Sequence, residues 1–255
     1  MTGPADLRIV AVPDFPLVEA GTDLVSELLR CLGNARLVLE DNDVVAFAQK
    51  VVSKSEGRLI DLATITPSAK ALELAAVVQK DARLVELVLR ESRRIVRTAK
   101  DVLIVEHRLG FVMANAGIDQ SNVSGSSESA LLLPEDPDGS AQALREEILK
   151  RTGRLVAVLV TDSFGRPWRV GTTGVAIGAA GIASIVDLRG TPDMFGRTLR
   201  VSVVGHADEI AAAASLVMGQ GAERRPVVIV RGLAASSAHC GAQALLRPPG
   251  EDLFR

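Results

Sequence analysis

The sequence Ala-Asn-Ala-Gly-Ile-Asp-Gln-Ser-Asn-Val, residues 114–123, is the stretch around which the rest of the chain is organised. It follows two apolar segments, residues 102–105 and 111–113, so we expect a strand that ends at a short polar loop. That loop places a carboxylate, carboxamides and a hydroxyl beside a core. Because buried polar groups cost free energy unless they are satisfied, we expect a hard cation or a phosphate-bearing ligand there.

A second segment, residues 159–166, has the same character: the apolar run Leu-Val-Thr ends in Asp162 and Ser163. Asp119 and Asp162 are therefore predicted at strand ends, where they form a candidate pair of metal ligands. The alternative is turn capping, a common role of aspartate. Two such sites, each flanked by further oxygen and amide groups, favour the metal.

Composition excludes several classes of protein. With 255 residues, of which 47% are hydrophobic and 24% charged, the chain is long enough to bury a real core. A net charge of −2 argues against a nucleic-acid-binding protein, and the 3% of aromatic residues, with no tyrosine, argue against base stacking on single strands.

The location is predicted from the cysteines and the hydropathy. Cys31 and Cys240 are too few and too far apart for a disulfide framework, which favours a reducing, cytoplasmic setting. The amino terminus lacks a signal peptide, and no apolar run reaches the roughly 20 residues that a membrane helix needs. We expect a soluble cytoplasmic protein.

Apolar patterns and capping residues predict the secondary structure. The expected strands span residues 7–12, 43–52, 102–105, 111–113, 155–161, 199–204 and 226–230. The expected helices span residues 24–32 after Asp23, 68–79, 81–97, 140–152 after Ser140, and 207–218 before Gly219. Residues 171–183 are rich in Gly and Ala, which suggests close backbone packing.

Strands and helices are mixed without regular alternation, and we find no internal repeat. An α+β fold therefore fits better than a doubly wound sheet. Residues 124–139, rich in Gly, Ser and Pro, are the only candidate internal boundary, so we treat residues 1–255 as one unit, with two subdomains as the alternative.

Several common catalytic motifs are missing from the sequence. It contains no P-loop, no strand-linked Gly-x-Gly-x-x-Gly, no Gly-x-Ser-x-Gly and no His-Glu-x-x-His. His107, His206 and His239 have no ligand spacing, so we interpret them as structural or surface residues.

Two further groups of polar residues leave alternatives open. Lys54 and Arg58 are expected at a strand exit beside a glycine, where they suit phosphate oxygens or form an ordinary polar loop. Arg166 and Arg169 flank Trp168, and fit either an anionic substrate or a subunit contact.

Taken in order, several segments are similar to the coenzyme F420-0:γ-glutamyl ligase family. They are residues 12–15 (Val-Pro-Asp-Phe), 51–58 (Val-Val-Ser-Lys-Ser-Glu-Gly-Arg), 114–123, 161–168, 208–211, 218–220, 230–232 and 251–255. The resemblance covers nearly the whole chain, and the decapeptide at residues 114–123 is its most specific part.

The resemblance implies an intertwined, homodimeric α+β fold with mixed, mostly antiparallel sheets. It implies a GTP-dependent ligase that joins L-glutamate to the phospholactyl-type carboxylate of a deazaflavin precursor, F420-0, and extends the tail by γ-linked glutamates. In the family's proposed mechanism the carboxylate is activated as an acyl phosphate. Two divalent ions, Mg²⁺ or Mn²⁺, and K⁺ are associated with the activity.

The resemblance also implies roles for individual residues. The positions that match metal ligands are Asp119, Asp162, Ser163 and Gln220. Those that match the surroundings of the nucleotide are Val12, Pro13, Asp14, Phe15, Gln49, Lys54, Asn122, Met218, Gly219, Gln220, Gly221, Ala222, Glu223, Arg224 and Arg225. Oxygen-bound divalent ions and a lysine suit attack of a carboxylate on phosphorus, which needs charge neutralisation on both reactants. We therefore assign catalytic roles to Asp119, Asp162 and Lys54.

This sequence departs from the family pattern at three places. Gln49 stands where Ser or Thr is frequent, Ser163 stands where Thr is frequent, and Arg224-Arg225 is more basic than usual, so the choice of GTP is less secure than the reaction type. Two other hypotheses remain: a metal-dependent nucleotide hydrolase or phosphotransferase acting on another carboxylate, and a non-catalytic deazaflavin-binding protein.

Overall fold

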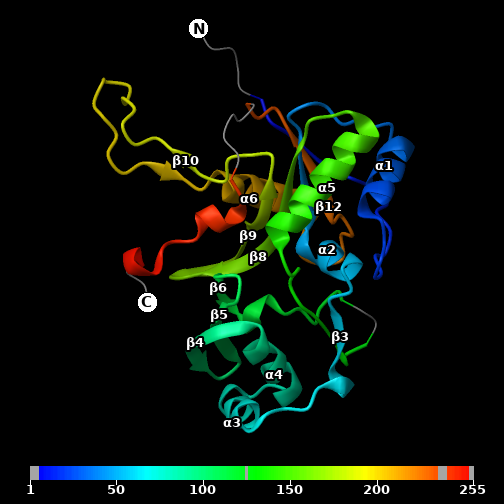
Figure 1. Cartoon of the computed structure of the whole chain (residues 1–255), viewed down its shortest axis with the longest axis vertical. Coiled ribbons are helices and arrows are strands. Elements are labelled where there is room, and N and C mark those ends of the chain that lie inside the picture. The colour runs from blue at the N-terminus through cyan, green and yellow to red at the C-terminus, as the bar shows by residue number, and fades with distance from the viewer. Residues whose placement is uncertain (1–5, 124–125, 235–239, 253–255) are drawn as a thin grey trace.

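The computed structural model describes residues 6–123, 126–234 and 240–252. A large sheet with helices on both faces forms the upper part of Figure 1, a smaller lobe lies below it, and an arm extends to one side. No helix among the described residues is long and apolar enough to cross a membrane. The α+β class predicted from the sequence is confirmed.

The large sheet has five strands in the order β1-β12-β2-β8-β9. Their bounds are β1 (Arg8–Ala11), β12 (Val227–Arg231), β2 (Val44–Ala48), β8 (Ala157–Arg166) and β9 (Arg169–Ala180). Only β2 and β8 are parallel, and the other neighbours are antiparallel. The parallel pair matters for function because it brings the ends of two distant segments together.

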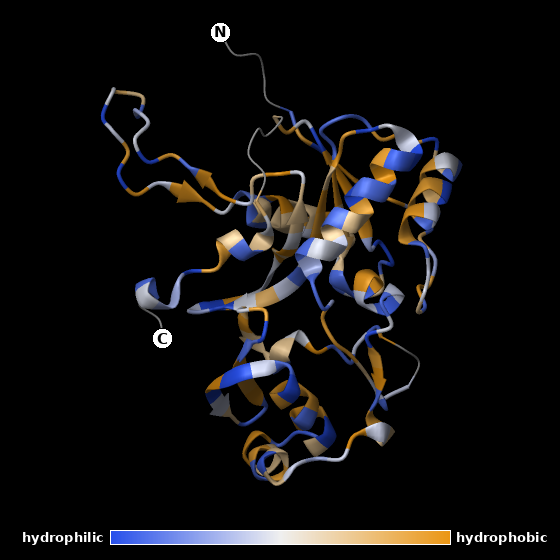
Figure 2. Ribbon diagram, in the orientation of Figure 1, coloured by the Kyte–Doolittle hydropathy of each residue, from blue (hydrophilic) through white to orange (hydrophobic). Residues whose placement is uncertain are grey.

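Alternating side chains of the sheet pack against helices on both faces. On one face Val45 and Phe47 join the core formed with α1 (Leu24–Asn34), α2 (Gln49–Ser55) and α5 (Pro137–Thr152). On the other face Val44 and Ala46 pack with α6 (His206–Met218). Figure 2 shows the strands as largely hydrophobic between the helices.

The glycines of β9 explain its unusual composition. A Cβ atom at Gly178 would lie 2.2 Å from the carbonyl oxygen of Pro137 on α5, and one at Gly174 would lie 2.5 Å from that of Ala211 on α6. The helices therefore approach the backbone of β9 closely on both faces, and the close packing predicted for this segment is confirmed.

Residues 59–123 and 126–131 form the smaller lobe. It contains the paired strands β3 (Leu59–Asp61) and β7 (Ser129–Leu131), a three-stranded antiparallel sheet of β4 (Ser92–Ala99), β5 (Val102–His107) and β6 (Val112–Ala114), the helices α3 (Ala69–Val78) and α4 (Ala82–Arg90), and the short 3-10 helices η1 (Leu62–Thr64) and η2 (Asn115–Gly117). The lobe has its own hydrophobic core.

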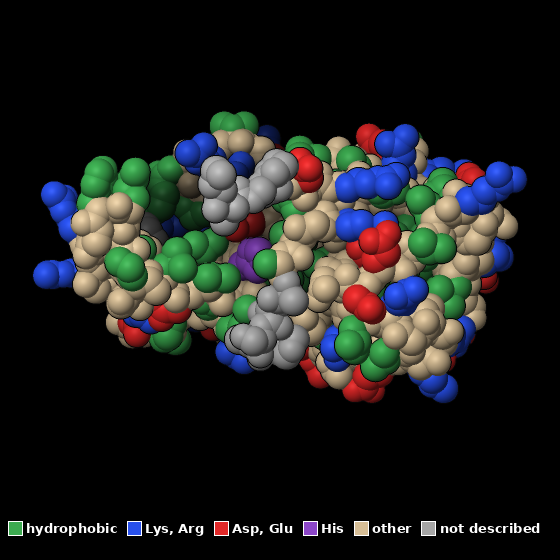
Figure 3. All heavy atoms as spheres, turned by 90° about the horizontal axis from the view of Figure 1, so that it is seen from above, with side chains coloured by type: hydrophobic (Ala, Val, Ile, Leu, Met, Phe, Trp, Pro, Cys, Tyr) green, Lys and Arg blue, Asp and Glu red, His purple; other side chains and the backbone are tan. Residues whose placement is uncertain are grey.

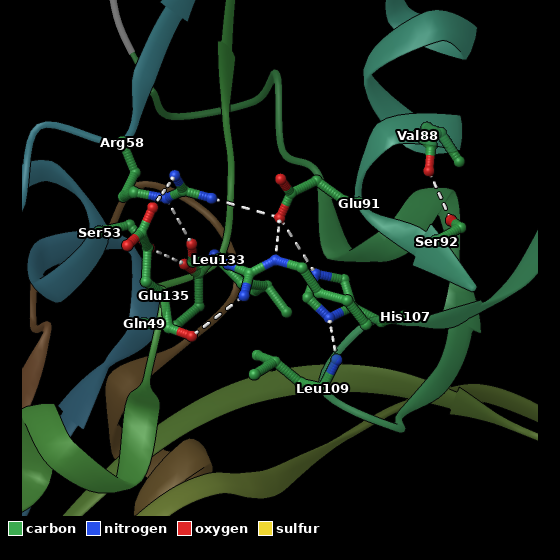
Figure 4. A network of polar contacts seen from close by, with 11 residues as sticks. Gln49, Ser53, Arg58, Val88, Glu91, Ser92, His107, Leu109, Leu133 and Glu135 are labelled. Atoms are coloured by element: carbon green, nitrogen blue, oxygen red, sulfur yellow. Dashed lines mark hydrogen bonds and ion pairs between the residues drawn. The ribbon is translucent and has the colours of Figure 1, made fainter.

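A partly buried polar network links the lobe to the segments that lead back to the sheet (Figure 4). The Glu91 carboxylate accepts hydrogen bonds from Arg58 at 3.2 Å and Arg108 at 3.0 Å, and His107 Nε2 lies 3.5 Å away. Burial alone would raise the pKa of Glu91, but His107 and the two arginines lower it to about 2. His107 is fully buried and accepts a hydrogen bond from the Leu109 amide, so the structural role predicted for it is confirmed.

A narrow arm projects from the large sheet and carries the two-stranded pair β10 (Val186–Asp187) and β11 (Val203–Val204). Met194, Phe195 and Val201 on this segment are 89%, 76% and 86% exposed. Figure 3 shows hydrophobic side chains gathered on this side of the molecule. The 3-10 helices η3 (Ala242–Leu245) and η4 (Pro249–Glu251) follow near the end of the described chain.

Several predicted boundaries were wrong. The strand predicted over 43–52 ends at Ala48, and helix α2 follows it directly. The β-branched Val51 and Val52 lie on this helix and are buried against the core. The helix predicted over 81–97 ends at Arg90, and its second half forms strand β4. Asp136, not Ser140, caps α5 by accepting from the Gly139 amide. Strand β8 runs on to Arg166, and only residues 203–204 of the segment 199–204 are in a strand. His206 is half-buried at the start of α6, and His239 lies outside the described residues.

Candidate functional site

A cavity of about 1660 Å³ lies between the large sheet and the smaller lobe. Five segments that are far apart in the sequence line most of it: residues 15–20, helix α2, residues 112–123, the β8–β9 hairpin and the loop after α6. Asp119 and Asp162, predicted from the sequence as a pair, both line this one cavity.

A left-handed turn brings Asp119 into the cavity. Asn115, Ala116 and Gly117 after β6 have φ of 51°, 53° and 66°, conformations that are unfavourable for residues other than glycine. At Gly117 a Cβ atom would also lie 2.6 Å from Met113 Cε, so a larger residue would have to displace side chains of the core as well as adopt a strained φ. Asp119 then pairs with Leu131 through two backbone hydrogen bonds of 3.0 and 2.8 Å.

Two residues of α2 hold the Asp119 carboxylate. Gln49 is 1% exposed, donates from Nε2 to Asp119 Oδ2 at 2.7 Å, and accepts from the Ser53 hydroxyl at 2.8 Å. Lys50 places its Nζ 3.5 Å from Asp119 Oδ1 and donates to the carbonyl oxygen of Ser121 at 3.0 Å. The Asp119 carboxylate is therefore oriented by one neutral donor and partly compensated by one cation.

Asp162 lies within β8, not at its end as predicted. The β8–β9 register shifts between Val160 and Thr161, an irregularity of the kind that redirects side chains near functional sites. The Oδ1 atom of Asp162 accepts a hydrogen bond from the Ser163 amide at 2.8 Å. Burial and then the charge of Asp119 raise the pKa of Asp162 to about 7, while burial raises the pKa of Asp119 against the effect of Lys50 and Gln49. The two carboxylates therefore raise each other's cost of ionisation, and the charge of Lys50 offsets this only in part.

This donor set fits a divalent cation. Mg²⁺ is typically bound by one or two carboxylates together with water and substrate phosphates. Ser163 and Gln220, the two other predicted ligands, also line the cavity. No group of three or more His, Cys, Asp or Glu side chains occurs among the described residues, here or elsewhere, so a cation at this site would need ligands besides the two carboxylates.

Asn122 connects Lys54 of α2 to the loop after α6. Lys54 Nζ donates to the Asn122 carbonyl oxygen at 3.2 Å, and Asn122 Nδ2 donates to the Gly221 carbonyl oxygen at 3.1 Å. Burial, followed by the charge of Lys50, lowers the pKa of Lys54. Lys54 therefore lies on a helix facing the cavity, and not at a strand exit, while Arg58 belongs to the network around Glu91.

The structure brings most, but not all, of the predicted nucleotide residues to the cavity. Those that line it are Phe15, Gln49, Lys54, Asn122, Met218, Gly219, Gln220, Gly221, Ala222, Arg224 and Arg225. Val12 is fully buried in the core, and Pro13 and Asp14 are exposed outside the lining. Glu223 also lies outside the lining, because its carboxylate accepts from the Gly221 amide at 2.8 Å and closes the loop on itself.

Lys50 contacts Asp119 in the cavity, and the sequence analysis did not identify it as a site residue. Its signal was present in the helical spacing of Lys50 with Lys54 and of Gln49 with Ser53. The strand predicted over residues 43–52 would instead have put Gln49 and Lys50 on opposite faces.

Comparison with known proteins agrees with the geometry. Residues 14–232 match the model of a family described as F420-0:Gamma-glutamyl ligase. The chain is 45% identical over 259 residues to the coenzyme F420:L-glutamate ligase of Methanopyrus kandleri, with all of both chains covered. It is 44% identical over 251 residues to the protein of the same name from Methanothermobacter thermautotrophicus (98% of this chain, 99% of the relative), and 41% over 243 residues to that from Methanocaldococcus jannaschii (95% and 94%). The chain therefore belongs to the F420-0:γ-glutamyl ligase family.

Proposed function

We propose that this enzyme is a GTP-dependent ligase that adds one or more γ-linked L-glutamates to the carboxylate of the deazaflavin precursor F420-0. The observation that carries the proposal is the carboxylate pair, Asp119 and Asp162, in one cavity with the Lys54–Asn122–Gly221 chain of hydrogen bonds. Family membership, as the names of the relatives indicate, supports the same substrates.

The residues divide into those for cations and those for the nucleotide. Asp119, Asp162, Ser163 and Gln220 would hold two divalent ions, Mg²⁺ or Mn²⁺, which neutralise the charge on the triphosphate and on the attacking carboxylate. Gln49 orients Asp119, and Lys54 with the loop of residues 218–225 would bind the phosphates.

The chemistry needs no protein nucleophile. A carboxylate oxygen of the precursor attacks the γ-phosphorus, the bond to the β-phosphate oxygen breaks, and GDP leaves. The glutamate amine then attacks the acyl carbon, loses a proton and expels phosphate. In keeping with this, no Cys or His among the described residues lines the cavity.

A homodimer is part of the proposal. The exposed Met194, Phe195 and Val201 of the arm form an apolar surface of the kind that marks protein interfaces. Light scattering should give a dimer, and Phe195→Glu should give a monomer; a monomeric wild-type protein would contradict this.

A potassium requirement and a cytoplasmic location also belong to the proposal. Exchange of K⁺ for Na⁺ in the assay tests the potassium requirement.

The test of function is product mass. We would incubate the purified protein with F420-0, L-glutamate, GTP and Mn²⁺ and expect a mass gain of one or more glutamyl units together with GDP and phosphate. Phosphate release without glutamylation would indicate a nucleotide hydrolase or phosphotransferase, and neither product would indicate a non-catalytic deazaflavin-binding protein. Replacing GTP by ATP tests the choice of nucleotide.

A further inference from the structure

Six cationic side chains line the cavity, and they differ in what they contact. Lys50 and Lys54 are held by Asp119, Ser121 and Asn122. The other four are arginines, Arg166, Arg169, Arg224 and Arg225, and none of them forms an ion pair with any described residue. Arginines without acidic partners in a cavity are suited to anionic ligands, because the guanidinium matches phosphate and carboxylate oxygens in pairs.

The four arginines lie in two separate segments. Arg224 and Arg225 belong to the loop after α6, which is joined to Lys54 through Asn122. Arg166 and Arg169 are at the end of β8 and the start of β9, and they face each other across the hairpin. Arg166 is on β8, the strand that carries Asp162 and Ser163, and Arg169 is on the neighbouring strand β9.

The hairpin separates its two kinds of side chain. Arg166 and Arg169 line the cavity, whereas Trp168 and Val170, 82% and 102% exposed, do not. The sequence left two roles open for this segment, binding of an anionic substrate and contact with another subunit. Because Arg166 and Arg169 face the cavity, binding of an anionic substrate fits these two residues. A subunit contact fits the exposed apolar side chains of Trp168 and Val170.

We infer that Arg166 and Arg169 bind the phosphodiester of the deazaflavin precursor. This inference rests on the proposed function. In the precursor the phosphodiester is separated from the reacting carboxylate by one oxygen and one carbon, so it must lie near the Asp119–Asp162 pair when the carboxylate meets the γ-phosphate, and it needs cations other than those assigned to the triphosphate. Lys54, Arg224 and Arg225 are on the nucleotide side, and the hairpin arginines are the free cations that remain.

The wall of the cavity supports this placement of the precursor. Apolar side chains of the smaller lobe, Ile104 on β5 and Val112 on β6, also line the cavity, and β6 packs against β8. The planar aromatic deazaflavin ring therefore has an uncharged surface to pack on, next to the strand that carries Arg166.

Steady-state kinetics with each substrate varied in turn tests the assignment. Loss of a charged hydrogen bond to a phosphate should raise KM for the precursor about 10- to 100-fold in Arg166→Gln and in Arg169→Gln, and further in the double variant. KM for GTP and for glutamate should stay within about twofold of the wild type. A rise in KM for glutamate or GTP instead, or no change in any KM, would overturn the assignment.

Direct binding gives a second readout. The fluorescence of the deazaflavin reports the affinity of the protein for F420-0 without turnover. A deazaflavin nucleoside without the phosphate is the comparison ligand, because it cannot contact the arginines through a phosphodiester. The arginine variants should lose affinity for F420-0 but bind the phosphate-free nucleoside as the wild type does. Equal losses for both ligands would show that the arginines do not act on the phosphodiester.

A matched control and the wild type separate the outcomes. Arg97→Gln removes an exposed arginine from β4 outside the cavity, and should leave every constant unchanged. Arg169→Lys keeps the charge but loses the paired geometry, so its KM should fall between wild type and Arg169→Gln. A wild-type protein that makes no glutamylated product would refute the proposed function, whereas an active wild type with unaffected variants would refute this inference alone.

Discussion

Replacing Asp162 by asparagine should stabilise the metal-free protein at alkaline pH while it abolishes activity. The folded protein raises the pKa of Asp162 from 3.8 to about 7, first through burial and then through the charge of Asp119. A raised carboxylate pKa means that the group is ionised more easily in the unfolded chain. Stability is therefore lost as the pH rises from the unfolded pKa to the folded one.

The size of the effect follows from the shift. About three pKa units at roughly 1.4 kcal/mol each give an upper value of about 4 kcal/mol above pH 7, and because Asp162 is only half-buried we expect about 2–4 kcal/mol. Asparagine has the shape of the protonated acid and keeps an oxygen for the Ser163 amide. The gain should shrink towards zero as the pH falls to about 4.

Urea unfolding of EDTA-treated wild type and Asp162→Asn between pH 4 and 9 measures this difference. Asp101→Asn, on an exposed turn outside the cavity, controls for the loss of one negative charge. Addition of Mn²⁺ should then stabilise the wild type and not Asp162→Asn. If the variant is less stable than the wild type at pH 8, or equally stable, the ionised Asp162 carboxylate does not destabilise the metal-free protein, and the reasoning is refuted.

Three further changes test other parts of the site and fold. Gln49→Ala removes the donor that orients Asp119, so Mn²⁺ affinity measured by electron paramagnetic resonance should fall about 10- to 100-fold, whereas the exposed Gln142→Ala should have no effect; unchanged affinity would exclude an orienting role. Lys50→Met removes the cation that neighbours Asp119, so Mn²⁺ should bind the nucleotide-free protein several-fold more tightly, and weaker binding would show that Lys50 does not compete with the metal. Arg231→Ala leaves Asp43 buried without its paired arginine and should cost about 3–5 kcal/mol in urea unfolding, against less than about 1 kcal/mol for Arg154→Ala in an exposed pair; equal losses would refute the importance of burial.

Four of the five strands of the large sheet were predicted because apolar, β-branched runs dominate them, whereas the Gly- and Ala-rich β9 was not predicted as a strand. The strand at residues 226–230 and the helix after Asp23 were predicted to within one or two residues. Asp119 and Asp162 were identified by their shared pattern, an apolar run followed by oxygen-bearing side chains, and the structure places both in one cavity.

The errors arose where tertiary contacts override local preference. Val51 and Val52 favour a strand by themselves, but in the structure they lie on helix α2 and pack against the core. The same helix carries Gln49 and Lys50. The segment after Arg90 continues a helical pattern, yet Ile95 and Arg97 pair with β5. Asn115 and Gly117 are residues that tolerate the left-handed conformation, but Ala116 between them gives no local signal for it.

Anomalous diffraction at the manganese edge, from crystals grown with Mn²⁺ and a non-hydrolysable GTP analogue, tests the central claim most directly. We predict a manganese peak within ligand distance of both the Asp119 and the Asp162 carboxylates, next to the γ-phosphate. Bound nucleotide with manganese ligated by neither carboxylate would contradict the account.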